Sequence, residues 1–528
     1  MGSRPVVRVP VRVWIGATGH RDVTETDAFV AAVSQVIAET RAAVQAAGID
    51  EVLFGVVSAL AEGSDRIIAR TVLAEPGAVL EAALPLPADD YERDFDGAAS
   101  RAEFRELLGR AASVRTEPAS ADRESAYMLA GYRVVERCDV LVAVWDGAPA
   151  HGLGGTADVV AAARRAVPSP VIWRIQPGTW RLERDTGSLD VTAYVQLARF
   201  VGESTPGADG ADGADGLAGT VRRAAQAAAV PDGVLDPWLR WISPAFDRAD
   251  ALAVRYQRLY NLSTSGLFVG SALAVALGAL QVVVLHDQVW LVAGELVLLV
   301  GLLALVVVAR RGELHARWLS YRALAEVCRS SFFLALVEDG SRGRTGASVG
   351  QRTGRWVPRA AEELWLARPR GDVPVRAGQL RELLVRGWVE DQARYQVSRG
   401  RRLGRQERAV LGAVYGLFAV TLAAVATHLV TDLRDAGGHL AGLFALVAIV
   451  LPAVGAALGA LRAQRNLQQN AARALHSGEV LATLGERLSV ATRPEELSRL
   501  GRQVAEHLAQ ENLDWYGGML YRDVELHV

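Results

Sequence analysis

Four long apolar segments in the second half of the sequence constrain the fold more than any other feature. They occupy residues 265–285, 289–308, 409–430 and 439–461. Each has about the twenty residues that a helix needs to cross a bilayer, which is unusual for four buried helices of one soluble core. Because the connection within each pair is short, the sequence predicts an all-α membrane domain with four transmembrane helices in two hairpins.

The distribution of arginine predicts how these helices are oriented. The two turns inside the hairpins hold few basic residues, whereas the other ends of the segments are flanked by Arg255, Arg258, Arg310, Arg311, Arg401, Arg402, Arg405, Arg408, Arg462 and Arg465. By the positive-inside rule, both termini are then cytoplasmic. Every basic residue is arginine rather than lysine, which we interpret as the codon bias of a high-GC bacterium. The expected location is a bacterial plasma membrane.

Small residues and one acid stand out within the apolar segments. Pairs of glycines four positions apart occur at Gly266 and Gly270, Gly412 and Gly416, and Gly455 and Gly459. Such pairs allow close helix packing within one chain or between chains, so we expect a homo-oligomer. Glu295 is a candidate gating residue because a carboxylate inside a span is costly, although water has access from the nearby outer turn.

The two hairpins resemble copies of one another. Arg255-Tyr256-Gln257 precedes the first hairpin, and Arg394-Tyr395-Gln396 precedes the second. Each hairpin is also followed by a charged, amphipathic segment that predicts a long cytoplasmic helix. The sequence therefore suggests an internal duplication of the membrane domain.

The N-terminal part of the chain alternates between apolar strands and amphipathic helices. Strands are expected at residues 6–15, 52–60, 79–86, 140–145 and 170–175. This alternation predicts an α/β Rossmann-like fold with a doubly wound parallel sheet. Ligands bind such sheets at the carboxyl ends of the strands.

Three of these strands end in loops with the sequences GATGHRD, SALAEGSD and WDGAPAHGLGGT. Glycine lets the backbone approach a ligand, and a glycine loop before a helix presents N–H groups that suit phosphate. Thr156 is expected to cap the helix that follows. The predicted ligand-binding residues are Gly16, Thr18, Gly19, His20, Arg21, Ser58, Glu62, Gly63, Asp65, Asp146, Gly154, Gly155 and Thr156. Each residue alone also has an ordinary structural explanation, but three convergent loops favour a site.

Two of the loops resemble known motifs. The stretch from Val57 to Asp65 resembles the SGLAxGxD segment of Smf/DprA proteins, and Gly154-Gly155-Thr156 resembles the GGT core of the LOG nucleotide hydrolases. Together they are similar to the SLOG superfamily, which includes the nucleotide-sensing region of TRPM channels. The resemblance implies a pocket for a nucleotide-derived ligand such as a cyclic oligonucleotide or an ADP-ribose derivative. The catalytic Glu of LOG enzymes corresponds to Val159, which favours a sensor.

The membrane half resembles the SLATT domains, which are two-helix effector modules associated with SLOG domains in bacterial conflict systems. Trp318, Tyr321, Arg322 and Ala323 carry this resemblance together with the hydropathy pattern. It implies a receptor-effector that opens a pore or disrupts the membrane in anti-phage defence. Two alternatives stay open. One is a membrane-tethered nucleotide hydrolase of LOG type with Glu62 or Asp158 as acid/base. The other is a constitutive channel or transporter with a structural Rossmann domain.

Composition limits the partners further. The formal net charge is −2 and no basic, aromatic groove is apparent, so we expect no nucleic-acid partner. Cys138 and Cys328 lie far apart, and the nine histidines form no ligand pattern, so no metal site and no cofactor beyond the ligand are expected.

The predicted organisation follows from these features. Residues 201–216 include Pro206 and a GAD repeat, which predict a flexible linker. The predicted parts are a SLOG-like domain at 1–180, a linker at 181–246, a first hairpin with its cytoplasmic helix at 247–345, a helical connector at 346–407, and a second hairpin with C-terminal helices at 408–528.

Overall fold

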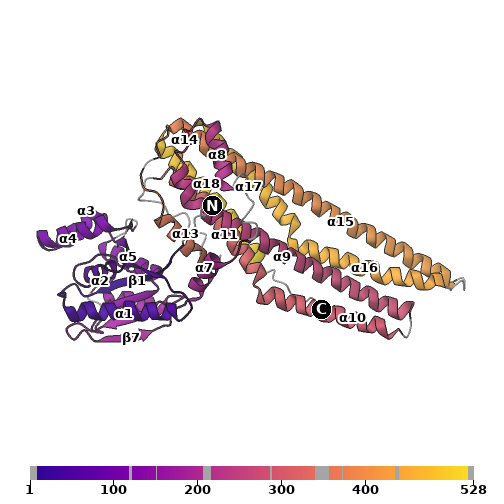
Figure 1. Cartoon of the computed structure of the whole chain (residues 1–528), viewed down its shortest axis with the longest axis horizontal. Coiled ribbons are helices and arrows are strands. Elements are labelled where there is room, and N and C mark those ends of the chain that lie inside the picture. Colours follow the sequence, from indigo (N-terminus) through magenta and orange to yellow (C-terminus); the bar gives the residue numbers. More distant parts are fainter. Residues whose placement is uncertain are drawn as a thin grey trace, which may run out of the picture. The chain divides into compact units, whose positions relative to one another are not determined.

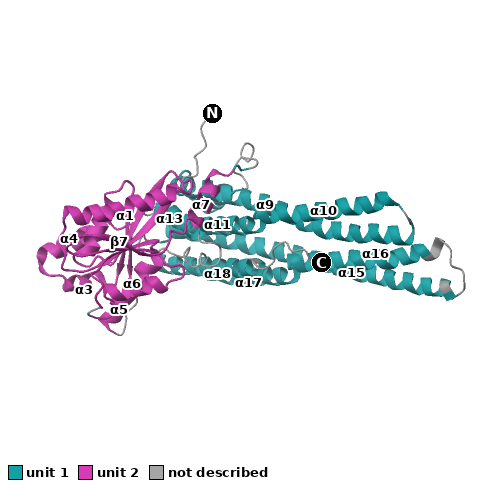
Figure 2. Cartoon of the chain, turned by 90° about the horizontal axis from the view of Figure 1, so that it is seen from below, with its two compact units in different colours: residues 1–5, 204–528 teal, residues 6–203 magenta. Residues whose placement is uncertain are grey.

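The computed structural model divides the chain into two compact units, which are Val6–Glu203 and Ser204–Val528 (Figure 2). The structure describes residues 9–117, 122–149, 152–205, 216–285, 288–338, 356–371, 373–433 and 439–520. The GAD repeat and the acidic turn of the second hairpin around Asp435 lie outside the described residues. Each unit is therefore described by itself.

The first unit is built on one seven-stranded sheet with the order β4-β3-β2-β1-β5-β6-β7. The strands are β1 (Val11–Gly19), β2 (Val52–Ser58), β3 (Val79–Leu84), β4 (Ser113–Thr116), β5 (Val140–Val144), β6 (Val171–Ile175) and β7 (Leu182–Thr186). All neighbouring pairs are parallel except β6 and β7. Every residue of β5 is buried, as expected for a parallel strand between two helical layers. The predicted Rossmann-like sheet is confirmed.

Helices cover both faces of this sheet. They are α1 (Asp27–Gln45), α2 (Ser64–Leu73), α3 (Ala88–Tyr91), the 3₁₀ turn η1 (Glu92–Asp94), α4 (Gly97–Arg110), α5 (Arg123–Arg137), α6 (Thr156–Arg165) and α7 (Thr192–Gly202). Helices α1 and α2 contact each other on one side, and α5 and α6 contact each other on the other (Figure 2). The winding reverses between β1 and β5, which is the switch point where ligands bind in such folds.

The structure corrects several predicted boundaries in this unit. Strand β1 runs to Gly19 rather than ending at Ile15, so the glycine-containing stretch after Ile15 is part of the strand. The expected last strand is followed by β7, which pairs with β6 at the edge of the sheet. Strands β4 and β7 escaped prediction because both are short and carry charged side chains typical of sheet edges. The unit extends beyond residue 180 because β7 and α7 pack on it.

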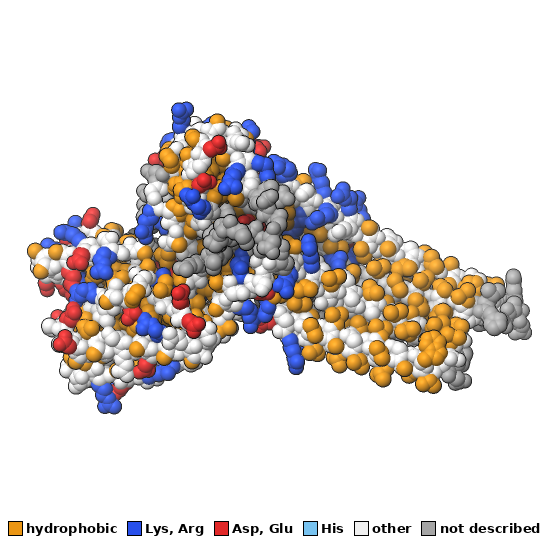
Figure 3. Space-filling view, viewed as in Figure 1, with side chains coloured by type: hydrophobic (Ala, Val, Ile, Leu, Met, Phe, Trp, Pro, Cys, Tyr) orange, Lys and Arg blue, Asp and Glu red, His pale blue; other side chains and the backbone are white. Residues whose placement is uncertain are grey.

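In the second unit, all the elements among the described residues are helices (Figure 1). Its elements are α8 (Leu217–Ala227), α9 (Asp236–Val283), α10 (Val289–Arg311), α11 (Leu314–Ala335), α13 (Trp356–Leu366), α14 (Ala377–Leu384), the π-helix η2 (Val385–Val389), α15 (Glu390–Leu433), α16 (His439–Arg465), α17 (Leu467–Val490) and α18 (Pro494–Leu520). Four helical stretches are long and apolar enough to cross a membrane, which agrees with the four predicted segments. Their apolar side chains form the orange surface in Figure 3.

Helices α9 and α15 continue without a break from polar sequence into the apolar segments. The predicted boundaries at residues 247 and 408 therefore fall inside single helices. Most of the predicted linker at 181–246 is also ordered, because it contains β7, α7, α8 and the start of α9. A continuous helix that enters the apolar region directly can transmit a displacement of its polar end.

The two halves of the helical unit share a common construction. In the first half α9 packs on both α10 and α11, and in the second half α15 packs on both α16 and α17. The junctions after the hairpins are also alike, because Glu313 and Asn466 each adopt a left-handed conformation, with φ of 51° and 47°. Helices α9 and α16 join the halves. These parallels support the duplication suggested by the sequence.

The glycine pairs in the apolar segments differ in what they contact. A Cβ added at Gly270 would lie 2.5 Å from Leu302 of α10, so the first pair serves packing within the hairpin. A Cβ at Gly412, Gly416, Gly455 or Gly459 would have no described heavy atom within 4 Å. Glu295 directs its carboxylate toward Gly278 of α9, where an added Cβ would lie 3.6 Å from Oε1. This acid therefore faces the neighbouring helix of its own hairpin.

The contrast between Gly270 and Gly416 gives a direct test of this packing. We expect Gly270→Val to lower the free energy of unfolding by about 1–3 kcal/mol, because the new side chain must displace Leu302. Gly416→Val is the matched control and should change stability by no more than about 0.5 kcal/mol. Thermal unfolding of the detergent-solubilised chain measures both. Equal effects of the two substitutions would show that α9 does not pack against α10 through Gly270.

Candidate functional site

The loop after β1 lies at the switch point and contacts two other elements. The backbone N–H of His20 donates to the carbonyl of Val144 at the end of β5, over 3.1 Å. The carbonyl of His20 accepts from the Ser64 hydroxyl, over 2.8 Å, and from the Ser64 backbone N–H. A Cβ at Gly19 would collide with both Ser64 and Val144. The end of β1, the start of α2 and the end of β5 therefore meet at one point, as the sequence predicted for these loops.

Gly63 is the residue that allows this close approach. Its φ of 74° is left-handed, and a Cβ would lie 2.1 Å from the carbonyl oxygen of Arg21. Only glycine combines that conformation with that space. Gly63 thus acts through backbone geometry, and it brings the N-terminus of α2 against the loop that carries His20 and Arg21.

Asp146 borders the same point from the end of β5. Its Oδ1 lies 3.5 Å from Nε2 of His20 and accepts from the backbone N–H of Ala148 over 2.9 Å. The Ala148 hydrogen bond lowers the pKa of Asp146, and the nearby His20 adds to this effect. Asp146 is exposed. It is therefore an ionised carboxylate that remains accessible to a ligand.

The GGT loop lies against α5. The conformation of Gly154 is left-handed, with φ of 85°, and a Cβ there would lie 2.7 Å from the backbone nitrogen of Met128. The backbone N–H of Gly154 donates to the Asp158 carboxylate over 3.1 Å. The expectation that Thr156 caps the helix is wrong, because Gly155 occupies the cap and Thr156 is the first residue of α6. Thr156 is therefore free of a capping role and half-buried at the helix start.

Tyr127 of α5 joins the two parts of the site. Its Cβ lies beside Gly154, and the guanidinium of Arg21 lies 5.6 Å from the centre of its ring. The Tyr127 hydroxyl donates to Asp94, which also accepts from Arg123 over 2.6 Å. Burial and the Asp94 carboxylate raise the pKa of Tyr127. The polar edge thus continues from the β1 loop across α5 to the segment after β3.

Ser58 and Asp65 form a buried pair beneath this edge. The Ser58 hydroxyl donates to Asp65 over 3.1 Å and accepts from the backbone N–H of Leu60 over 2.9 Å. Burial raises the pKa of Asp65 from 3.8 to about 7, although the hydrogen bond from Ser58 and the charge of Arg21 oppose this rise. Ser58 is fully buried. It therefore holds the turn with its left-handed Leu60 rather than facing outward.

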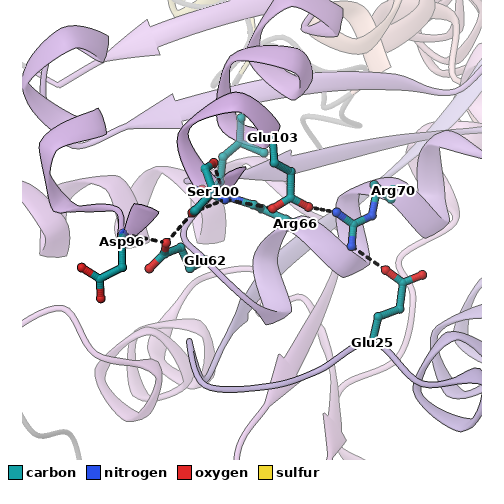
Figure 4. A network of polar contacts seen from close by, with 8 residues as sticks. Glu25, Glu62, Arg66, Arg70, Asp96, Ser100 and Glu103 are labelled. Atoms are coloured by element: carbon teal, nitrogen blue, oxygen red, sulfur yellow. Dashed lines mark hydrogen bonds and ion pairs between the residues drawn. The ribbon is translucent and has the colours of Figure 1, made fainter. Parts of the chain in front are cut away.

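Glu62 belongs to a second network, which ties α2 to α4 (Figure 4). Its Oε1 accepts from the Ser100 hydroxyl and from the backbone N–H of Asp96. The buried guanidinium of Arg66 donates to Ser100 and, over 2.9 Å, to Glu103. The predicted ligand-binding role of Glu62 therefore competes with a structural one, because one of its carboxylate oxygens is already engaged within the protein.

Gly16, the remaining glycine predicted near the end of β1, lies within the strand and is buried. A Cβ at Gly16 would lie 2.9 Å from the Cys138 sulfur, inside the layer between β1 and α5. Thr18 is half-buried near the end of β1. Gly16 thus lies too deep to touch a ligand, whereas Thr18 is close to the edge.

Tyr91, Asp94 and Tyr127 were not among the site residues predicted from the sequence. Tyr91 is fully buried, and its hydroxyl has no hydrogen-bond partner among the described residues. Tyr91 and Asp94 follow β3, which is the neighbour of β2 in the sheet. Ligands bind parallel sheets at the carboxyl ends of their strands, so the position of Tyr91 and Asp94 after β3 was a signal for them as well. Tyr127 carried no such signal, because it lies within a helix and comes to the edge only in the folded chain.

The arrangement can hold an anion beside an aromatic or hydroxyl-bearing group. Arg21 is exposed and supplies a positive charge, and the start of α6 supplies backbone donors. His20, Asp146 and Thr18 supply further polar groups around them. Among the described residues, no three His, Cys, Asp or Glu side chains form a group that could hold a metal ion. Comparison with protein-family models, curated proteins and solved structures finds no match to this chain.

Substitution of Gly63 tests the backbone approach that shapes the site. We expect Gly63→Ala to be more destabilising than Gly97→Ala, because both positions are left-handed but only Gly63 has a carbonyl in the way. Strain alone should cost about 1–2 kcal/mol at either site, and the collision adds about 1–3 kcal/mol at Gly63. Pulse proteolysis of the detergent-solubilised chain measures the difference. Matching losses at both positions would argue against the close contact with Arg21.

The raised pKa of Asp65 predicts a pH-dependent stability. Folding favours the protonated carboxyl, so this stabilisation is complete below the ordinary value of 3.8 and is lost as the pH rises through about 7. We expect the wild-type free energy of unfolding to fall, relative to Asp65→Asn, between about pH 4 and pH 7. Urea denaturation at constant ionic strength measures both proteins. A difference that does not change with pH would mean that Asp65 is ionised in the folded state.

Proposed function

We propose that the chain is a membrane-embedded receptor-effector. Its α/β unit binds a nucleotide-derived anion, and its helical unit responds by forming a pore or disrupting the membrane. The observation that carries the proposal is the convergence of β1, α2 and β5 at the switch point, with Arg21, His20 and Asp146 around it. The same chain also carries four helices able to cross a membrane.

The chemistry of the edge suits a ligand that combines phosphate with a sugar or base. Arg21 offers the two parallel donors that match a phosphate, and the N-terminus of α6 offers backbone donors and a positive dipole. Asp146 is an ionised acceptor for hydroxyl or amino groups. A cyclic oligonucleotide or an ADP-ribose derivative has all of these parts, as the resemblance to SLOG proteins implies.

Three contacts favour sensing over hydrolysis of the nucleotide. Val159 is buried, and it occupies the position of the catalytic acid in LOG enzymes. It packs closely on α5, because a Cβ added at Gly131 would lie 2.7 Å from its Cγ2. Asp158 accepts from Gly154, and Glu62 accepts from Ser100 and Asp96. The acids nearest to a catalytic position are therefore engaged in holding loops, which supports a binding function.

The response requires that the ligand bind one arrangement of the chain better than another. The helices α9 and α15 offer a mechanical route, since each is continuous between its polar and apolar parts. Several chains would line a pore, because the sequences of the four apolar segments carry no polar stripe. The arginine distribution supports a bacterial plasma membrane with both termini in the cytoplasm, and the domain combination supports a role in anti-phage defence.

Dye release from liposomes tests the proposal. The full chain is reconstituted with a trapped dye, and cyclic oligonucleotides and ADP-ribose derivatives are added one at a time. We expect one of them to trigger leakage, and we expect Thr156→Arg to reduce the response at least tenfold because its side chain would fill the start of α6. Thr186→Arg on the exposed strand β7 is the matched control and should leak like the wild type.

Two other results would each replace this proposal. Nucleotide turnover without leakage would indicate a tethered hydrolase. Leakage that is the same with and without every ligand, and in both variants, would indicate a constitutive channel.

A further inference from the structure

Four arginines form an exposed face on α15 immediately before its apolar segment. Arg401, Arg402, Arg405 and Arg408 are all exposed. None of them forms an ion pair or a hydrogen bond to a carboxylate within the described part of the chain. Spacings of three and four residues place Arg401, Arg405 and Arg408 on the same side of the helix. We call these four residues the α15 arginine face, and Figure 3 shows arginine side chains gathered along this helix.

The other charged residues of this stretch point elsewhere. Glu407 accepts from Nε of Arg462 in α16 over 2.7 Å, so its charge is neutralised inside the hairpin. Arg399 interacts electrostatically with the half-buried carboxylates Glu326 of α11 and Glu511 of α18. The helix therefore sorts its charges, with the paired groups turned inward and the four unpaired cations turned outward.

In the proposed membrane placement, the α15 arginine face lies at the depth of lipid headgroups. With a rise of about 1.5 Å per residue, all four arginines lie within about 12 Å of Ala409, where the apolar segment begins. The headgroup region on each side of a bilayer is about 5–8 Å thick, and a long arginine side chain spans the remainder. Nε of Arg408 donates to the carbonyl of Gly404 over 3.3 Å, so its side chain bends back from the apolar segment.

The same face has room for an incoming group. A Cβ added at Gly404, between Arg401 and Arg408 in the sequence, would have no described heavy atom within 4 Å. A phosphate group can therefore approach the helix backbone there and reach guanidinium groups on either side. Arginine binds phosphate through paired donors and is favoured at such sites.

We propose that the α15 arginine face binds the phosphate headgroups of anionic phospholipids in the cytoplasmic leaflet. The proposal rests on the membrane placement in the proposed function, but it does not depend on nucleotide sensing. Charge complementarity favours anionic phospholipids as the ligand of this face. The four unpaired arginines lie next to the apolar segment, where they meet the anionic headgroups of a bacterial-type bilayer. Binding there would fix the depth of α15 and stabilise one arrangement of the second hairpin.

Lipid-dependent thermal unfolding of the full chain tests this proposal. The protein is held in a neutral detergent and titrated with phosphatidylglycerol, with phosphatidylcholine, or with inorganic phosphate. We expect phosphatidylglycerol to raise the Tm and the other two additives to leave it unchanged. Replacing all four arginines with Gln should abolish the shift, and Arg405→Gln alone should lower the apparent affinity about fivefold.

A matched control removes the same charge elsewhere. The exposed residues Arg110, Arg165, Arg487 and Arg493 are replaced together with Gln, and this variant should keep the full shift. A variant with lysine at all four positions of the α15 arginine face keeps the positive charge and should keep most of the Tm shift. This variant tests the role of charge even if the four-Gln variant does not fold.

Three results would overturn the inference. These are an equal shift with phosphatidylcholine, an equal shift with inorganic phosphate, and an undiminished shift in both the four-Gln variant and Arg405→Gln. A chain that fractionates without detergent in the soluble part of a lysate would refute the membrane placement itself. Absence of nucleotide-triggered leakage would leave this test unaffected, so the two proposals fail separately.

Discussion

The contact between the ends of β1 and β5 positions most of the candidate site. The backbone hydrogen bond from His20 to Val144 fixes the β1 loop, and Ser64 then binds the His20 carbonyl and anchors α2 to the same place. This packing is possible because Gly19 and Gly63 present no side chain. Polar groups that are distant in the sequence are held together by the backbone, so their arrangement does not depend on flexible side-chain contacts.

The helical unit obeys a different constraint. A bilayer offers no hydrogen-bond partners, so a spanning segment must satisfy its own backbone groups and is helical. In the first hairpin, glycine allows α9 and α10 to pack through Leu302. In the second hairpin, a Cβ added at Gly412, Gly416, Gly455 or Gly459 would have no described heavy atom within 4 Å. Helices α15 and α16 still contact each other, through other residues. The two halves therefore have a similar framework but different surfaces.

Prediction from the sequence succeeded where the pattern itself has a physical cause. The apolar segments and the buried strand β5 follow directly from hydrophobicity, and the meeting of the loops after β1, β2 and β5 at one sheet edge follows from the parallel strand order. Prediction failed for β4 and β7, because short polar edge strands lack a hydrophobic pattern. It also missed Tyr127, since nothing in the sequence shows which helical side chain reaches Arg21. The functional roles of the predicted site residues stay predictions.

The sequence by itself determined the two kinds of architecture and the edge of the sheet at which the three glycine-containing loops meet, because hydrophobic period and glycine placement act locally. Only the tertiary structure decided which of the predicted residues face that edge. It turned Ser58 inward to Asp65, engaged Glu62 with Ser100, and left Arg21 and Asp146 exposed. The physical reason is that a polar side chain binds whatever partner the fold brings within reach, and the sequence does not record those distances.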